Sequence, residues 1–227
     1  VAIIEADELI SPINVPRLKP TYLIVNNVSR DSMLRNGNPE YIAERLRRAA
    51  EGSPQSIVLM CGDDPVSSLI GENNPRVVFG AKYLNTNPLK TTIDDYPICL
   101  KCGGKIEYDF RNYRNIGDYK CTSCTFKAPK RDYLVESVGV NEMVVKEEKG
   151  SFTYPIPSSA IHNIYNTAAI VSILRNIGEK PEKIAEALKN IKPPQSREGS
   201  EVVSGVNIHR KLAKTHNPTA VSTVFEN

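Results

Sequence analysis

Four cysteines form two close pairs in the middle of this chain. Two residues separate Cys99 from Cys102, two separate Cys121 from Cys124, and eighteen lie between the pairs. Thiolates at this spacing supply the four tetrahedral sulfur ligands that Zn²⁺ prefers in proteins. Four protein ligands complete the coordination sphere, whereas a catalytic zinc keeps one position open. The spacing therefore predicts a structural zinc ribbon over residues 97–133.

Two disulfides are the alternative use of these cysteines. The sequence shows neither a signal-peptide pattern nor an apolar run long enough to span a bilayer, so it gives no indication of secretion. The fifth cysteine, Cys61, ends an apolar run and is expected to be a packed thiol rather than a ligand. The reducing cytoplasm is the compartment that suits five free or metal-bound cysteines.

The ribbon is more basic than the chain as a whole. The net charge of the 227 residues is +3, too small to indicate a polyanionic partner. Residues 97–133, however, hold eight Lys or Arg against four Asp or Glu, with aromatic residues interleaved. This pattern can bind nucleic acid through phosphate contacts and base stacking. A small module instead packs its aromatic side chains around the metal and leaves its charges solvated, so we expect no nucleic-acid partner.

Three apolar segments are expected to be strands of an α/β sheet that is mostly parallel. They cover residues 1–4, 21–25 and 56–61, and a helix that begins with Asn38 as N-cap separates the last two. The third segment is apolar throughout, as in a parallel strand that is buried on both faces. Polar residues follow each strand, at the edge where such sheets place nucleotide or Mg²⁺ chemistry.

The ribbon is expected to be an insertion in this domain. A short strand over 76–79 precedes it, and the alternating segments 133–138 and 142–146, typical of antiparallel strands, follow it. A helix from Ser158 to Ile177, capped by its first residue and ended by a glycine, comes next. A second helix over 181–191 leads into a proline-containing linker.

Short polar motifs follow one another along the chain in a specific order. They are Glu5 at a strand end, Asn27 with Arg30-Asp31, Gly62-Asp63-Asp64-Pro65, the run from His162 to Ala169, and Arg197-Glu198. In this order they resemble the central domain of the Mur ligases, which are ATP-dependent amide-forming enzymes. The resemblance implies a central domain over 1–195, the ribbon inserted at 97–133, and the start of a C-terminal α/β domain at 196–227.

The four-cysteine ribbon inserted in this chain resembles the ribbon found in the ligase-like subunits of the lipid II isoglutaminyl synthases. This resemblance implies ATP-dependent amidation of the D-glutamate α-carboxylate of lipid II through an acyl phosphate, with ammonia from a GatD-like glutamine amidotransferase subunit. It implies ATP, magnesium and structural zinc as cofactors. It also implies a cytoplasmic protein that meets the inner face of the membrane only through its lipid-linked substrate. Another Mur-type ligase with an acquired ribbon is the alternative.

The same resemblance assigns roles to single residues. Glu5 is the expected magnesium ligand, and Arg197 is expected to reach the nucleotide phosphates. Asn166 is expected to contact the adenine, with Asn163 nearby. The alternative for both asparagines is a capping or packed amide.

Asp63 and Asp64 have two interpretations of equal weight. They either orient the ribose side of the nucleotide site or cap the turn that follows the strand. The Gly-rich phosphate loop and the catalytic aspartate of the family have no counterpart in this sequence. We therefore expect the chain to be a fragment of a longer subunit and to be inactive by itself.

Overall fold

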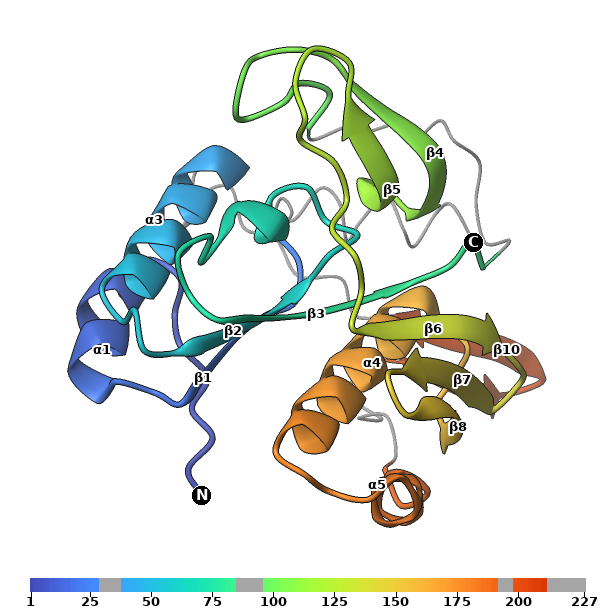
Figure 1. Cartoon of the computed structure of the whole chain (residues 1–227). Coiled ribbons are helices and arrows are strands. Elements are labelled where there is room, and N and C mark those ends of the chain that lie inside the picture. The colour runs from blue at the N-terminus through green and yellow to red at the C-terminus, as the bar shows by residue number, and fades with distance from the viewer. Residues whose placement is uncertain (29–37, 85–95, 192–197, 212–227) are drawn as a thin grey trace.

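A six-stranded sheet forms the centre of the protein in the computed structural model, which describes residues 1–28, 38–84, 96–191 and 198–211 (Figure 1). The strands lie in the order β1-β2-β3-β6-β7-β8. Their bounds are β1 Tyr22–Val25, β2 Ile57–Cys61, β3 Arg76–Ala81, β6 Tyr133–Val138, β7 Glu142–Glu147 and β8 Gly150–Pro155. Neighbours from β1 to β6 are parallel, whereas β7 is antiparallel to both β6 and β8. The predicted mostly parallel α/β sheet is confirmed, and β8 is a strand that the sequence did not lead us to expect.

Helices cover both faces of the parallel part of the sheet. They are α1 Ser11–Leu18, α3 Pro39–Glu51, α4 Ile161–Asn176 and α5 Pro181–Leu188, with a short 3₁₀ turn, η1, over Ser67–Leu69. Val58 and Met60 of β2 face the core beneath α3, whereas Leu59 and Cys61 face the core beneath α4. Successive strand side chains point to opposite faces, so a continuous apolar segment fits a sheet that is covered twice. The predicted packed thiol at Cys61 is confirmed, because its side chain is fully buried.

Local signals at the helix ends explain most of the helix boundaries. The side chain of Asn38 accepts a hydrogen bond from a first-turn backbone N–H and caps α3, as expected. Gly178, with a φ of +96°, follows the end of α4, also as expected. The start of α4 differs from the prediction, because Ala160 is the N-cap. Ser158 lies outside the helix, where its Oγ accepts hydrogen bonds from the Ala160 N–H and from Asn163 Nδ2.

The expected strand over residues 1–4 is wrong. Residues 1–6 have no regular secondary structure and are exposed. A strand is stable only where a neighbour pairs with its backbone N–H and C=O groups, and no described strand pairs with this segment. The chain instead enters α1, which packs against α3.

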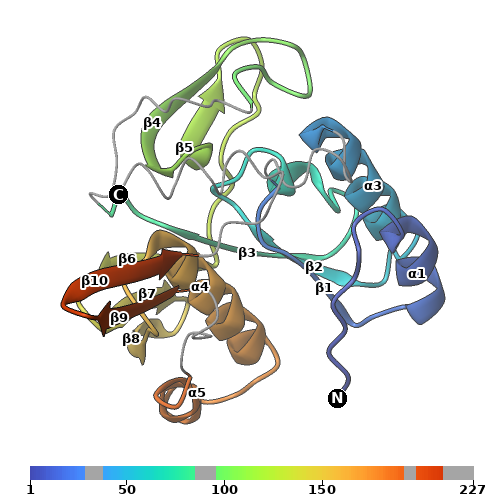
Figure 2. The same cartoon turned by 180° about the vertical axis from the view of Figure 1, so that it is seen from behind.

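The ribbon is a separate antiparallel hairpin that interrupts the chain between β3 and β6, as expected. It consists of β4, Ile106–Tyr113, and β5, Ile116–Cys121. Seen from either side, it lies at the end of the molecule opposite α5 (Figure 2). It contacts the segment that follows β2, through Asp63, and η1, through Ser68. The limits of the domains themselves stay predictions.

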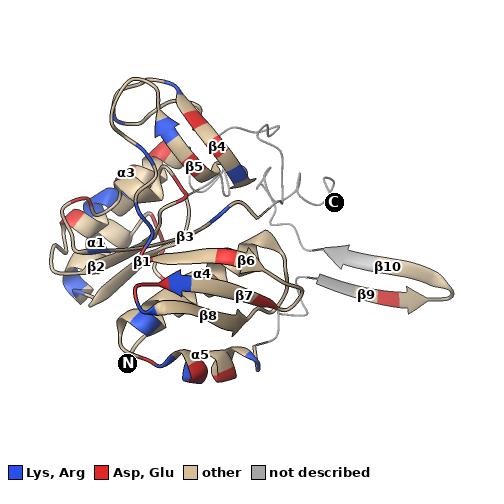
Figure 3. Cartoon of the chain, turned by 45° about the vertical axis from the view of Figure 1, so that its right-hand side comes forward, with Lys and Arg blue, Asp and Glu red and all other residues tan. Residues whose placement is uncertain are grey.

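A second hairpin follows the linker and projects away from the main sheet (Figure 3). Its strands are β9, Glu198–Val203, and β10, Val206–Lys211. Ser204 and Gly205 both have positive φ, which suits a two-residue turn between twisted strands. Arg197, the expected phosphate contact, lies outside the described residues.

Candidate functional site

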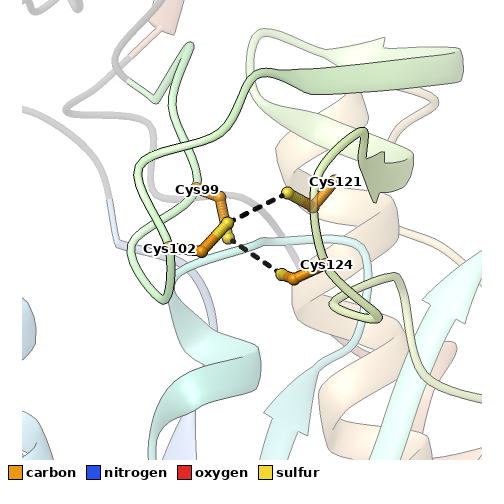
Figure 4. Close-up of side chains that lie close together, drawn as sticks. All are labelled: Cys99, Cys102, Cys121 and Cys124. Atoms are coloured by element: carbon orange, nitrogen blue, oxygen red, sulfur yellow. Dashed lines mark hydrogen bonds between the residues drawn. The ribbon is translucent and has the colours of Figure 1, made fainter.

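The four predicted metal ligands converge at one end of the ribbon (Figure 4). The Sγ atoms of Cys99, Cys102, Cys121 and Cys124 all lie within 4.8 Å of one another. The Sγ of Cys99 is 3.8 Å from that of Cys124, and the Sγ of Cys102 is 3.4 Å from that of Cys121. Sulfurs bound tetrahedrally to one zinc at about 2.3 Å lie about 3.8 Å apart, so the donor set fits such an ion. All four cysteines are free thiols in the structure, and these two Sγ–Sγ distances are far longer than the bond of about 2.05 Å in a disulfide, so the arrangement favours a metal over two disulfides.

Backbone amides support the sulfur atoms. The N–H groups of Gly104 and Ser123 point at Sγ of Cys102 and Cys121, at 3.4 and 3.3 Å. Gly103 adopts a φ of +73°, which lets the chain turn tightly behind the first pair. The Ser123 N–H lowers the pKa of Cys121 to about 7, whereas, against the effect of the Gly104 N–H, the neighbouring thiols raise the pKa of Cys102 to about 12.

The aromatic residues of the ribbon pack behind the metal ligands. Tyr119 is 3% exposed and contacts the rings of Tyr108 and Phe126, with centroids 6.2 and 5.4 Å away. Together with Ile106 and the ligand cysteines they form a small core of their own. The expected packing around the metal ligands is confirmed for these three side chains, whereas Tyr113 packs against the main core and Phe110 contacts Tyr83. The expectation that the charges of the ribbon are solvated is wrong for Arg111 and Arg114, which are buried.

A cavity of about 360 Å³ separates the metal end of the ribbon from the main sheet. Lys101, Lys127 and Arg76 line it together with the ligands Cys102 and Cys124 and with one acid, Glu72, which pairs with Lys101. A divalent ion bound by four thiolates carries two net negative charges. The cations of the cavity therefore suit the counter-charge of the metal centre itself.

The opposite end of the ribbon is docked onto the main sheet through Asp63, at the carboxyl end of β2. The Oδ1 atom of Asp63 contacts Nε and Nη2 of Arg131 at 2.8 and 2.7 Å. Its Oδ2 accepts hydrogen bonds from the Ala81 N–H at 2.7 Å and from the Tyr165 hydroxyl at 2.6 Å. Its main-chain carbonyl accepts the Gly117 N–H from the ribbon at 2.9 Å. Burial raises the pKa of Asp63 against the opposing effect of Arg131.

Asp64 joins three segments that meet at the carboxyl end of β2. Its carboxylate accepts hydrogen bonds from the Val28 N–H at 2.8 Å, from the Ser67 hydroxyl at 2.6 Å and from Asn115 Nδ2 at 3.0 Å. The N–H groups of Val66 and Ser67 also point at it, so Asp64 caps the turn at η1 as one interpretation proposed. Burial raises its pKa to about 6, although the Ser67 hydroxyl opposes this. Both aspartates are fully buried. A ribose contact by either one stays a prediction.

Gly80 makes room for this arrangement. A Cβ atom placed on Gly80 in β3 would lie 2.2 Å from Oδ1 of Asp63, closer than any real contact. Only glycine leaves the carboxylate free to reach the neighbouring Ala81 N–H.

The two predicted adenine contacts lie on the first half of α4. Asn166 is exposed, and its Oδ1 accepts a hydrogen bond from Asn26 Nδ2 at the carboxyl end of β1. Asn163 is partly buried and donates to the Ser158 hydroxyl. The two side chains share one helix face, because residues three apart lie on the same side. Their contact with adenine stays a prediction.

Glu5 is exposed in the segment that precedes α1. Within the described ranges, the four cysteines are the only group of three or more side chains able to hold a metal together. Magnesium commonly takes only one or two carboxylates from the protein and keeps water for the rest. Glu5 as its ligand therefore stays a prediction.

Sequence reasoning missed the residues that join the ribbon to the rest of the molecule. Arg131 and Asp118 form a second ion pair at 2.8 Å beside Asp63. Asn112 and Asn115 reach from the turn region of the hairpin into the sheet edge. Basic residues and asparagines near a turn are usually solvated, so the sequence carries no signal that sets these apart.

Curated relatives of the chain are MurT subunits of lipid II isoglutaminyl synthase. The one from Staphylococcus aureus is 26% identical over 187 residues, which cover 81% of this chain and 42% of that protein. The one from Streptococcus pneumoniae is 28% identical over 192 residues, with 82% and 42% covered. The chain thus spans about two fifths of the length of these relatives. No protein-family model matches the sequence.

Solved structures give the same answer for the fold. A pseudomurein peptide ligase type C from Methanothermus fervidus superposes with a TM-score of 0.73 at 22% identity, over 87% of this chain and 39% of that one. MurF from Acinetobacter baumannii superposes with a TM-score of 0.62 at 12% identity, over 95% and 39%. This chain has the Mur ligase fold. The resemblance predicted from the order of the polar motifs is confirmed.

No helix of the Mur-ligase-like chain, within the part that the structure describes, has the length and apolar character needed to cross a membrane.

Proposed function

We propose that this chain belongs to the ligase-like subunit of a lipid II isoglutaminyl synthase and contributes its ATP-binding central domain. The observation that carries the proposal is the 26% to 28% identity to MurT subunits across four fifths of the chain. The Mur ligase fold and the four-thiol ribbon support it. The coarser part of the proposal is an ATP-dependent amide-forming ligase of cell-wall synthesis.

The proposed reaction converts a carboxylate into an amide. The D-glutamate α-carboxylate of lipid II attacks the γ-phosphorus of ATP, which yields an acyl phosphate and ADP. Ammonia, released from glutamine by a GatD-like partner subunit, then attacks the acyl carbon. Inorganic phosphate leaves, and the product is D-isoglutamine. Mg²⁺ supplies charge neutralisation for the phosphoryl transfer when it is bound.

The described residues would bind and orient the nucleotide. Asn163 and Asn166 present two amide groups on one face of α4. An amide can both donate to and accept from an adenine ring, so this pair suits base recognition. Glu5 and Arg197 keep their proposed roles at Mg²⁺ and at the phosphates.

The ribbon metal is proposed to be structural zinc. Four thiolates select Zn²⁺ over the harder ions and leave no position for a water molecule. The ribbon would thus contribute to folding and not to the chemistry of the reaction.

The test uses the full-length protein together with its candidate glutaminase partner. The expected results are about one zinc per chain, and ATP hydrolysis that requires both glutamine and lipid II and yields amidated lipid II. Asn166→Ala should raise the KM for ATP, whereas Asn190→Ala, at an exposed position in the turn that follows α5, should not. Zinc binding without lipid-dependent turnover would contradict the isoglutaminyl synthase assignment.

A Mur-type peptide ligase that carries a ribbon is the second candidate function. The superposition on a structure named as a pseudomurein peptide ligase, at a TM-score of 0.73, supports it. This candidate predicts ATP hydrolysis that depends on an amino acid or peptide amine and is indifferent to glutamine. The same assay, run with each amine donor separately, distinguishes the two functions.

A further inference from the structure

The ribbon and α4 meet at a buried hydrogen-bonded contact far along the hairpin from the metal ligands. Asn112, 1% exposed, donates from Nδ2 to the Tyr165 hydroxyl at 3.1 Å and to the Lys82 carbonyl at 2.8 Å. Its Oδ1 accepts the Leu84 N–H at 2.9 Å. The Tyr165 hydroxyl in turn donates to Asp63 at 2.6 Å. One side chain of the ribbon thus contacts both α4 and the segment that follows β3.

Two successive residues of α4 form hydrogen bonds with residues that follow two different strands. Tyr165 is tied to Asp63 after β2, and Asn166 is tied to Asn26 after β1. Successive residues of a helix point about 100° apart, so two such ties fix the rotation of the helix about its axis. The rotation of α4 decides where Asn163 and Asn166 point.

The strand β5 links this contact to the metal centre. It begins next to Gly117, whose N–H binds the Asp63 carbonyl, and ends at the metal ligand Cys121. A two-stranded hairpin with a small core is marginally stable alone, and metal binding supplies much of the folding free energy of such modules. Loss of the metal should therefore loosen the hairpin, and its hold on α4 with it.

We propose that Asn112 and Tyr165 are positioning residues, through which the metal-loaded ribbon fixes the rotation of α4 and thereby the face that carries Asn163 and Asn166. The inference rests on the proposed function only where it treats this face as the nucleotide site. Metal occupancy of the ribbon and nucleotide affinity are then coupled, and the coupling is reciprocal.

The experiment compares Tyr165→Phe with Tyr22→Phe in the full-length protein. Both variants remove one hydroxyl that bonds near α4. Tyr165 bonds at the half that carries the asparagines, whereas Tyr22 donates to Asn176 at the other end of the helix at 2.8 Å. The first readout is hydrogen exchange of the α4 amides, with the metal bound and after chelation. The second is the dissociation constant for a non-hydrolysable ATP analogue in both states.

We expect chelation to speed exchange in the first half of α4 and to weaken binding of the analogue roughly tenfold, a typical coupling between two sites. Tyr165→Phe with metal bound should reproduce part of both effects and reduce the further effect of chelation. Tyr22→Phe should leave the response to chelation as in the wild type. Saturating analogue should slow metal loss to a chelator in the wild type, and less so in Tyr165→Phe.

Two results would overturn the inference. One is unchanged exchange in α4 after chelation, and the other is a response to chelation that Tyr165→Phe leaves intact. If α4 responds as expected but no variant binds the analogue, the positioning role stands and the proposed nucleotide function fails. If the metal-free protein unfolds, the test is the metal-bound comparison alone: exchange in the first half of α4 should be faster in Tyr165→Phe than in Tyr22→Phe, and equal rates would overturn the inference.

Discussion

The two ends of the β4-β5 hairpin are held by different kinds of interaction. At one end, four thiols surround a metal-sized space, and the charged side chains around them are mostly exposed. At the other end, the ribbon is held without a metal. Buried hydrogen bonds to Asp64 and Tyr165 and a buried ion pair with Asp63 connect it to the rest of the molecule. A module with little core of its own is thus stabilised at both ends by polar groups. The metal end has fewer such contacts: the Tyr119 hydroxyl donates to Ser68 at 2.6 Å, and Lys101 forms an exposed ion pair with Glu72.

Removal of one metal ligand should have the largest effect on the ribbon. In Cys121→Ser the metal content should fall from about one ion per chain to nearly none, because a hydroxyl is a poor zinc ligand. Cys61→Ala is the matched control. It removes a buried thiol outside the ribbon and should keep the metal. Metal analysis and limited proteolysis of the ribbon provide the measurement. A ribbon that stays protease-resistant in Cys121→Ser would show that its docked end suffices.

Asp63→Asn should be the most damaging change at the docked end. It leaves Arg131, whose side chain is 15% exposed, without its buried partner. Loss of one member of a largely buried pair costs about 3 kcal/mol in the free energy of unfolding. Asp118→Asn is the control, because Asp118 pairs with the same arginine but its side chain is 35% exposed. Its cost should be well under half as large. Equal costs in urea unfolding would show that burial does not set the strength of this contact.

Asp64 should give the docked end a pH dependence opposite in sign to that of the metal end, where acid protonates the thiolates. Its pKa is raised by burial from 3.8 to about 6, so folding favours the protonated carboxyl. This contribution is complete below about pH 4 and is lost as the pH rises through about 6, by up to roughly 3 kcal/mol. Asp64→Asn does not titrate and should lack this decline. Comparing the two proteins at each pH, with metal saturating, cancels any acid effect on the thiolates.

An exposed ion pair at the metal end should contribute least. Lys105 and Glu107 lie 3.1 Å apart with side chains 71% and 47% exposed. Water and salt screen such a pair, so Lys105→Gln should leave the unfolding midpoint and the metal content within experimental error of the wild type. A clear loss of stability would mean that charge on the surface of the ribbon matters more than its solvation suggests.

The metal end was predictable from sequence and the docked end was not. Cysteine spacing identifies the ligands, because few other arrangements need two such pairs. The apolar run of β2 likewise indicated a strand covered on both faces. In contrast, Asn112 and Arg131 belong to residue types that are usually solvated, and their burial depends on segments far away in the chain. The strand expected at residues 1–4 failed for a related reason, since apolar character does not supply a pairing partner.

The close packing of Gly80 against Asp63 has a consequence for the sequences of related proteins. No side chain fits at this position while Asp63 keeps its carboxylate at the Ala81 N–H and Arg131. A glycine in mid-strand costs conformational entropy, so nothing favours it once the aspartate is gone. Among related sequences, we expect glycine here to occur together with the aspartate and the arginine. The three residues would then form a signature that distinguishes chains with a docked ribbon from those without one.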